Sequence, residues 1–239
     1  MRDGLLHDLL TRGLDENGRL RDPDAHPEQF KDSPLGRIPR EWEYVPLEKV
    51  ARAQGGFAFS STSSVESGAP WLKIANVGQG KTIWEERSFL PEEFLGSYAD
   101  FVLSQDDIVV AMTRPVLNDV LKVAKLQKQD VPALLNQRVG RLKRNGAAVT
   151  NDFLYALMQA RFVAQEIEGL IFGTDPPNVS ASQIESITVP QPSNSEQKRI
   201  TDLLDTHDAR IRAEGAHCDK LKSQKKGMMD DLLTGRVRV

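Results

Sequence analysis

The sequence of 239 residues is poor in the side chains that form cross-links and metal sites. It contains one cysteine, Cys218, and four histidines. A single cysteine excludes an intrachain disulfide and a metal site built from a cysteine cluster. The histidines lie in the terminal segments, without a carboxylate or nucleophile at a spacing that would indicate a metal site or a triad. No catalytic residue and no metal ligand is predicted, so we expect a binding function.

Long hydrophobic runs are also missing. No stretch of 18 apolar residues occurs, and the first residues lack the hydrophobic region of a signal peptide. Apolar residues make up 39% of the chain and the mean hydropathy is -0.42. We therefore expect a cytoplasmic protein with no membrane segment, large enough for one sizeable globular domain and appended helices.

Net charge is small, at -3, and taken alone it argues against a nucleic-acid-binding protein. The average hides an asymmetry, because residues 101–150 carry eight basic and only four acidic side chains. A local basic surface can bind phosphate groups even when the whole molecule is acidic. Solvated surface charge is the alternative explanation.

Residues 196–233 have the pattern of a long helix with a coiled-coil seam. Apolar or compatible positions alternate in steps of four and three, the 3.5-residue repeat of such a seam. At 1.5 Å per residue the helix would extend about 55 Å, and Ser195 is a suitable N-cap. The alternative is one amphipathic helix packed on its own domain. The seam positions are Ile200, Leu204, His207, Ile211, Glu214, Cys218, Leu221, Lys225, Met228 and Leu232.

A short repeat connects the two ends of the chain. Residues 4–11 (GLLHDLLT) return as residues 227–234 (GMMDDLLT), with five of eight positions identical and two leucines exchanged for methionine. The chain therefore opens with a copy of the end of its own last helix. This pattern is typical of one unit of a tandem or circular arrangement.

The middle of the chain predicts an α+β fold of short strands and helices. We expect a helical segment and extended connector at 1–35, a globular domain at 36–193 and the long helix at 194–239. Predicted strands are 71–77, 101–103, 108–112, 120–124, 139–142 and 187–190, and predicted helices are 47–52, 152–168 capped by Asn151, and 181–185 capped by Ser180.

The segment 175–178 (DPPN) partly matches the loop with which amino-methyltransferases hold a target base. Its fourth residue is Asn178, which cannot stack on a base, and no glycine-rich strand-turn-helix for a methyl donor precedes it. Catalysis at this segment is not expected, because the other groups that it would need are missing.

Several segments together resemble the specificity subunits of type I restriction-modification systems. They follow the family's order along nearly the whole chain, and the most specific part is the Pro-x-Pro to Glu-Gln entry into a helix that ends in Leu-Leu-Thr-Gly. The matching segments are 30–36 (FKDSPLG), 38–42 (IPREW), 107–109 (DIV), 136–139 (NQRV), 173–180 (GTDPPNVS), 187–192 (ITVPQP), 196–197 (EQ) and 232–235 (LLTG).

Members of that family usually carry two target-recognition domains, each followed by a conserved helix, and the helices pair antiparallel. This chain is similar to one half, resembling the C-terminal half of a full-length subunit. The resemblance implies that residues 36–193 read one half-site of double-stranded DNA in the major groove. It also implies that methyltransferase subunits carrying S-adenosylmethionine dock on the helices, and that a motor and endonuclease subunit joins them. No cofactor is expected on this chain.

Two copies of the chain would restore the full layout as a homodimer. A split half with another partner, or a fragment, fits the same sequence. Dimerisation is assigned to Ile200, Leu204, Ile211, Cys218, Leu221, Met228 and Leu232.

DNA contact is assigned to the basic residues of the central segment, because phosphate neutralisation dominates affinity and arginine can pair with guanine. The assigned residues are Arg114, Lys122, Lys125, Arg138, Arg141, Lys143 and Arg144, with Thr113, Asn118 and 60–64 as weaker candidates. Two other functions fit the sequence: a coiled-coil tether that does not read DNA, and the recognition module of another restriction enzyme class.

Overall fold

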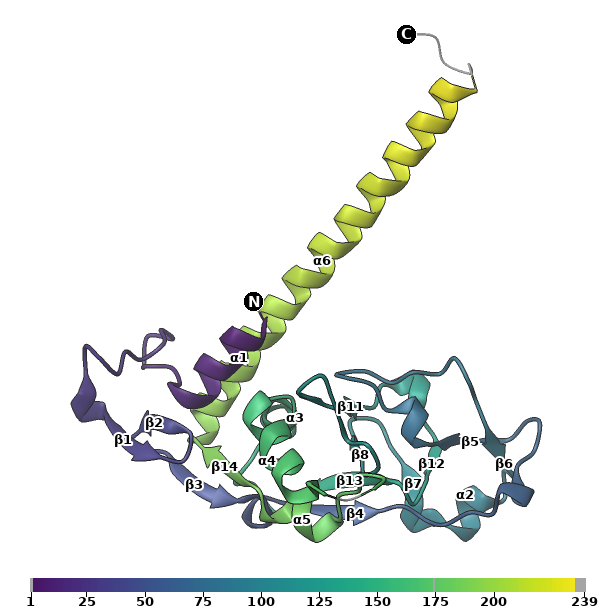
Figure 1. Cartoon of the computed structure of the whole chain (residues 1–239), viewed down its shortest axis with the longest axis horizontal. Coiled ribbons are helices and arrows are strands. Elements are labelled where there is room, and N and C mark those ends of the chain that lie inside the picture. The colour runs from purple at the N-terminus through teal and green to yellow at the C-terminus, as the bar shows by residue number, and fades with distance from the viewer. Residues whose placement is uncertain (1, 174, 235–239) are drawn as a thin grey trace.

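The computed structural model describes residues 2–173 and 175–234, and combines a globular α+β part with one long helix (Figure 1). The helix, α6 (Asn194–Leu233), leaves the globular part near one end and extends away from it. The predicted α+β fold with a long C-terminal helix is confirmed. Thr174 and Gly235, two residues of the matching segments, lie outside the described residues. Within the described part of the chain, no helix has both the length and the hydrophobicity needed to cross a membrane.

The first of two four-stranded sheets is antiparallel and forms the centre of the globular part. Its order is β11 (Val123–Lys125), β8 (Ile108–Ala111), β13 (Val139–Arg144) and β4 (Ala51–Gly55). All four residues of β8 are buried, as its continuous apolar sequence predicts for a central strand. The predicted strands at 108–112 and 139–142 are confirmed as β8 and β13.

The second sheet lies beside the first in the half of the globular part away from α6 (Figure 1). Its order is β6 (Phe89–Leu90), β5 (Ala69–Leu72), β12 (Ala133–Leu135) and β7 (Val102–Leu103), and β12 runs parallel to β5. Aromatic side chains pack together here around Phe59, including the stacked ring of Phe94 at the start of α2 (Phe94–Ser97). The predicted strand 71–77 is too long, because residues 74–76 form a 3-10 turn.

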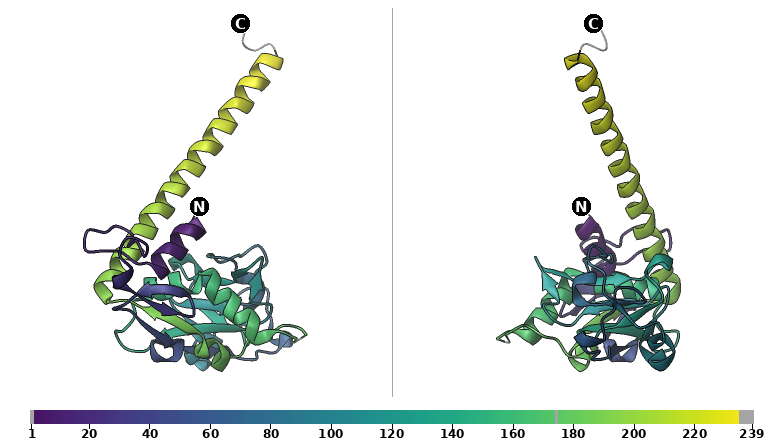
Figure 2. Two further views of the ribbon diagram at one scale, coloured as in Figure 1. Left: turned by 60° about the vertical axis from the view of Figure 1, so that its left-hand side comes forward. Right: turned by 90° about the vertical axis from the view of Figure 1, so that its right-hand side faces the viewer.

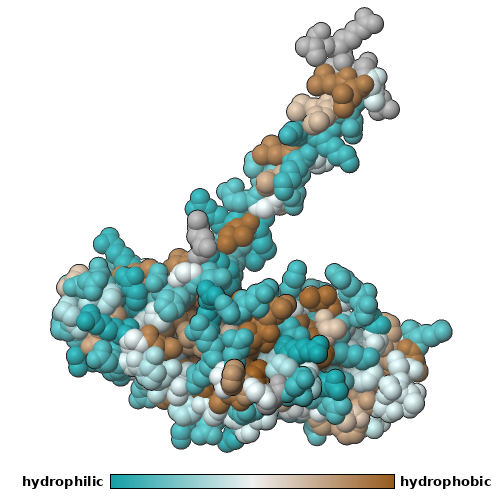
Figure 3. Space-filling view, in the orientation of Figure 1, coloured by the Kyte–Doolittle hydropathy of each residue, from teal (hydrophilic) through white to brown (hydrophobic). Residues whose placement is uncertain are grey.

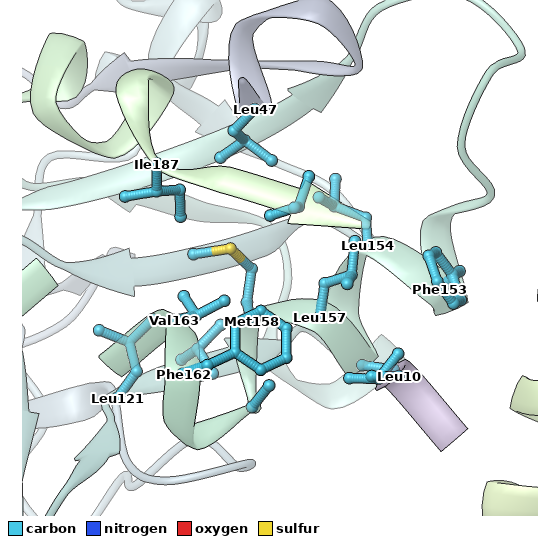
Figure 4. Packing of buried hydrophobic residues seen from close by; sticks show 14 of the residues in the cluster. Leu10, Leu47, Leu121, Phe153, Leu154, Leu157, Met158, Phe162, Val163 and Ile187 are labelled. Atoms are coloured by element: carbon cyan, nitrogen blue, oxygen red, sulfur yellow. The ribbon is translucent and has the colours of Figure 1, made fainter. Parts of the chain in front are cut away.

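Three helices cover the first sheet: α3 (Asn151–Met158), α4 (Arg161–Ile171) and α5 (Ala181–Ser186). Leucine and phenylalanine side chains of α3 and α4 pack with Leu10 of the N-terminal helix in one core (Figure 4). The prediction of a single helix at 152–168 is wrong, because Ala160 adopts an extended backbone (φ -71°, ψ 141°) that separates α3 from α4. Thr150, not Asn151, caps α3, since its side chain accepts from the Phe153 amide.

The N-terminal segment is more structured than an extended connector. It forms α1 (Arg2–Thr11), the hairpin β1 (Phe30–Ser33) and β2 (Gly36–Pro39), and β3 (Glu43–Pro46), which pairs with β14 (Thr188–Gln191) just before α6. A second hairpin, β9 (Val116–Leu117) and β10 (Val120–Leu121), lies between β8 and β11. The N-terminal segment, in contrast, brings α1 beside the base of α6 (Figure 2).

Two adjacent polar side chains hold the base of α6 on the globular part. Buried Glu196 accepts hydrogen bonds from the Trp42 indole nitrogen (3.0 Å) and the Leu14 amide (2.8 Å). The guanidinium of Arg21 donates to the same carboxylate at 2.5 Å. Gln197 bonds two carbonyl groups and one amide of the globular part. The direction of the helix is therefore set by satisfied buried polar groups.

The N-cap of α6 is Ser193, whose hydroxyl accepts from the Glu196 amide (3.3 Å), and not Ser195 as predicted. The strand pair ends at Gln191 and is followed by Pro192, which is buried. The helix therefore starts two residues earlier than predicted.

Candidate nucleic-acid interface

Three of the seven predicted basic residues gather at one end of the first sheet, where β8 ends. The backbone carbonyl of Lys122 accepts from the Ala111 amide (3.0 Å), and that of Arg138 accepts from the Met112 amide (2.9 Å). Arg114 follows two residues after Met112. The strand register therefore places the backbones of Arg114, Lys122 and Arg138 at the same end of the sheet, called the edge below, although 24 positions separate the first from the last.

A hollow at this edge combines the basic pair with apolar side chains. Arg114 and Lys122 line it together with Leu117 from the β9–β10 hairpin and Phe172 after α4. Leu117 is 55% exposed and Phe172 is 93% exposed. Glu168 also lines the hollow, and among the described residues no ion pair joins its carboxylate to Arg114 or Lys122. The hollow offers positive charge and an exposed aromatic ring to a ligand.

The basic pair is held at an energetic cost. Burial lowers the pKa of Lys122, and the nearby positive charge of Arg114 lowers it further. Arg114 itself has a left-handed backbone (φ 46°), which is strained for a residue with a side chain. Strain and like-charge contact persist only where the surrounding structure imposes them, and such features concentrate at functional sites.

The β9–β10 hairpin carries the next predicted residue, Asn118, at its tip. Asn118 and Asp119 both have positive φ angles (52° and 59°), as the two-residue turn of a tight hairpin requires. The carboxylate of Asp119 pairs with Arg161 of α4 at 2.6 Å, which ties the hairpin to the helix layer. The side chain of Asn118 is exposed beside the hollow.

Thr113 is less available than predicted. It is 8% exposed, and its hydroxyl donates to the Asn178 side-chain oxygen at 2.6 Å. The Arg114 amide donates to the Pro177 carbonyl (2.8 Å). The DPPN segment is thus a structural turn that supports the end of β8, and Ser180 after it caps α5 as predicted.

The side chain of Arg141 is not available for the predicted DNA contact in this structure. Its side chain is 7% exposed and pairs with Asp107 at 3.2 Å. The guanidinium also donates to the Gln54 side chain and to the backbone carbonyls of Asp100 and Val102. Arg141 therefore lies inside the fold and joins the two sheets. All its donors already have acceptors there, so none is left for DNA.

The remaining predicted residues lie elsewhere. Lys125 pairs with Asp152 (2.7 Å) and Asp106 (3.8 Å), so its charge is neutralised within the chain. Lys143 and Arg144 are exposed at the opposite end of β13 from Arg138. The serine-rich segment 60–64 forms a short exposed turn over the second sheet. The structure therefore does not join all the predicted residues into one surface.

Sequence reasoning missed Phe172 and Leu117. Both belong to apolar stretches that predict core positions, and only the folded chain shows their exposure. A weak signal existed for Phe172, since it stands between the end of a helix and Gly173.

The predicted dimerisation residues divide into two groups. Ile200 and Leu204 are buried within their own chain (0% and 4% exposed), so their assignment to a partner helix is corrected for this structure. They pack in the main core together with side chains of α1 and α3. The other five are exposed, and apolar side chains recur along α6 in Figure 3. The exposed group is Ile211, Cys218, Leu221, Met228 and Leu232.

Comparisons with known proteins agree with this architecture. A model of the type I restriction modification DNA specificity domain matches residues 39–223. The chain is 35% identical, over 100% of its length, to the type I restriction enzyme MjaVIII specificity subunit of Methanocaldococcus jannaschii. The chain belongs to the type I restriction-modification specificity subunit family.

Further relatives fit the same family. The EcoAI specificity subunit of Escherichia coli is 31% identical over 193 residues, 80% of this chain. In fold, the chain is similar to the crystal structure of the HsdS subunit from Thermoanaerobacter tengcongensis, with a TM-score of 0.57 and 18% identity over 87% of this chain. The expectation of a non-catalytic component is confirmed at the level of the family, because the named relatives are specificity subunits.

The chain spans between about a third and about half of the length of these relatives. It covers 54% of the MjaVIII subunit, 32% of the EcoAI subunit and 48% of the HsdS structure.

Proposed function

We propose that this chain recognises one half of a bipartite DNA target with the sheet edge that carries Arg114, Lys122 and Arg138. The observation that supports this most is the pairing of Arg114 with Lys122 beside an exposed aromatic ring. Bringing two positive charges together costs free energy, and a phosphate group placed between them would offset that cost. The family to which the chain belongs is named for DNA specificity.

Each group at the edge has a role that its chemistry suits. Lys122 and Arg138 neutralise phosphates and position the chain, which is the sequence-independent part of binding. Arg114 is the best candidate for reading guanine, because its guanidinium can donate two hydrogen bonds to one base edge. Asn118 can pair with adenine in the same way, while Phe172 makes apolar contact with a thymine methyl or a base step.

Two copies of the chain pair through antiparallel α6 helices in this proposal. The exposed apolar residues from Ile211 to Leu232 support it, since an isolated helix would gain nothing by presenting them to water. Methyltransferase subunits then dock on the paired helices and bring S-adenosylmethionine, and a motor and endonuclease subunit completes the assembly. Chemistry takes place on those subunits and recognition on this chain.

Salt-dependent binding to duplex DNA tests the proposed surface. Affinity should fall steeply between low and physiological salt, and Arg114→Ala and Lys122→Ala should each reduce the slope by about 0.9. Lys143→Ala is the matched comparison, because it removes an exposed charge from the opposite end of the same sheet. Equal effects of all three variants would contradict the assignment of the edge, and a flat salt response would favour the tether.

Modification mapping tests the role in the assembly. The chain is expressed with a methyltransferase subunit in an unmethylated host, and modified bases are located by long-read sequencing. A two-part palindromic motif with a fixed spacer is expected for two symmetric copies. A non-palindromic motif would show that another chain supplies the second half.

A further inference from the structure

The repeated segment is buried in one copy and exposed in the other. In α1, Leu6, Leu9 and Leu10 are 2%, 0% and 0% exposed. The matching residues at the end of α6 are Met229, Leu232 and Leu233, which are 49%, 50% and 81% exposed. One sequence pattern therefore fills a site on the globular part, while its second copy has nothing packed against it among the described residues.

The apolar face at the end of α6 is wider than the seam of a two-helix coiled coil. A coiled coil buries two positions per heptad, here Met228 and Leu232. The neighbours Met229 and Leu233 extend the apolar face to the width that α1 uses, since α1 packs against both α6 and the globular part. Thr11 and Thr234 even make the same hydrogen bond to the carbonyl four residues earlier. The end of α6 has the shape of a segment that docks as α1 does.

The α1 site also suits the end of a second α6 helix in the orientation of the bound helix and in charge. Arg2, at the start of α1, pairs with Asp208 in the first half of α6 (2.7 Å), while the amide of Leu14, just after α1, donates to Glu196 at the base of α6. The two helices are therefore antiparallel. In the repeat, Lys225 occupies the position of Arg2, so a helix end docked in the place of α1 would present the same positive charge to Asp208.

We propose that the end of α6 (225–234) of a second copy docks in the α1 site and displaces α1, so that α1 is an internal occupant of the dimer interface. This inference rests on the homodimer proposed above and specifies its contacts. In each copy, the second copy's Lys225 faces Asp208, and the second copy's Met229 and Leu233 take the places of Leu6 and Leu10.

The exchange sets the register of the whole coiled coil. With Lys225 beside Asp208, the two-fold axis falls near residue 216, and Ile211 lies opposite the second copy's Leu221. The heptad pattern is compatible with this alignment, because seam positions then face seam positions between Ile211 and Leu221. The ion pair selects this register from those that the heptads allow.

The exchange itself changes little apolar burial, since one copy of the pattern replaces the other. The net gain comes from the middle of the seam, where Ile211, Cys218 and Leu221 leave water only in the dimer. Displacement of α1 offsets part of this gain. Dimerisation should therefore depend on protein concentration, and α1 should be docked in the monomer and released in the dimer.

Substitutions at the end of α6 test the docking without disturbing the single chain. Leu233 is 81% exposed, so Leu233→Asp should leave the monomer folded and weaken the dimer about 100-fold or more, because each dimer would bury the new charge twice. Ser223→Asp, at the outermost heptad position, is the matched control and should change the dissociation constant less than about threefold. Equal effects of the two variants would overturn the docking.

Cysteine cross-linking tests the register in a Cys218→Ser background. Ile211→Cys combined with Leu221→Cys should form a disulfide-linked dimer under mild oxidation. Ile211→Cys combined with Met228→Cys, one heptad away, should remain largely uncrosslinked because the sulfur atoms would lie too far apart. Preferential linking of the second pair would overturn the register.

The deciding measurement is hydrogen exchange of the full chain below and above its dimerisation concentration, with the mass followed by sedimentation. We expect amides of residues 6–10 to lose protection in the dimer while those of 228–233 gain it. A dimer in which residues 6–10 stay protected would overturn the exchange and leave the proposed homodimer intact. A chain that stays monomeric would overturn both, and DNA binding, measured separately, would still decide the recognition role.

Discussion

Replacement of Glu196 by alanine should loosen the junction between α6 and the globular part. The substitution leaves two buried donors without an acceptor, the Trp42 indole nitrogen and the Leu14 amide, which are 0% and 2% exposed as residues. An unsatisfied buried donor costs about 1–3 kcal/mol. Arg21 loses its buried partner and keeps Glu41 on its exposed side. Since breaking a buried ion pair typically costs about 3–5 kcal/mol, we expect a loss of that size in the free energy of unfolding.

Urea denaturation followed by tryptophan fluorescence, at a concentration where the chain is monomeric, measures this loss. Glu196→Gln keeps an acceptor oxygen and should lose only about 1–2 kcal/mol. Glu214→Ala removes an exposed carboxylate from the same helix and is the matched control. If Glu196→Ala falls within about 0.5 kcal/mol of the control, the hydrogen bonds at the junction do not stabilise the fold and the reasoning is refuted.

Four further outcomes follow from the structure. Arg141→Ala should lower the free energy of unfolding by about 3 kcal/mol through its buried pair, whereas Arg114→Ala should weaken DNA binding with stability nearly unchanged; urea denaturation and DNA titration separate the two. The depressed pKa of Lys122 means that this group binds a proton more readily in the unfolded chain, so its own contribution to stability should increase as pH rises toward 10.5, and the difference between the Lys122→Met variant and the wild type in pH-dependent denaturation should show that contribution. Phe172→Ala should leave the melting temperature unchanged, because the ring is 93% exposed, and cost about 1–3 kcal/mol in DNA affinity; an unchanged dissociation constant would remove it from the surface. Leu221→Asp should convert dimers to monomers in sedimentation velocity, and a retained dimer mass would place the interface elsewhere.

Much of the fold follows from hydrophobic periodicity in the sequence. The apolar run of β8 and the capped helices α3 and α5 depend on local patterns, so their existence was predictable. The break at Ala160 was not, because apolar residues continue at helical spacing through it and only the packing of α4 on the core decides its direction. The antiparallel docking of α1 on α6 was equally hidden, since the repeat shows similarity and not contact.

The sequence predicts which segment of the chain carries the candidate interface, but not which residues of that segment belong to it. Charge composition indicated residues 101–150, and strand register that no local pattern reveals places Arg114, Lys122 and Arg138 at one end of the first sheet. Arg141 has the same residue type in the same segment, yet its acceptors come from three distant stretches of the chain. Side-chain chemistry alone cannot separate an arginine that binds within the fold from one that binds outside it.

The two kinds of charged residue differ in how many of their donors and acceptors already have hydrogen-bond partners within the chain. At the junction, the carboxylate of Glu196 receives three donors, and within the first sheet the guanidinium of Arg141 reaches several acceptors, so neither has capacity left for a ligand. At the end of β8 the opposite holds, because Arg114 and Lys122 repel each other across a hollow and Arg114 sits in a strained backbone. A phosphate would improve the second arrangement and could not enter the first. The closeness of two like charges beside an open hollow, more than the number of basic residues, is therefore what supports the proposed DNA recognition at this end of the sheet.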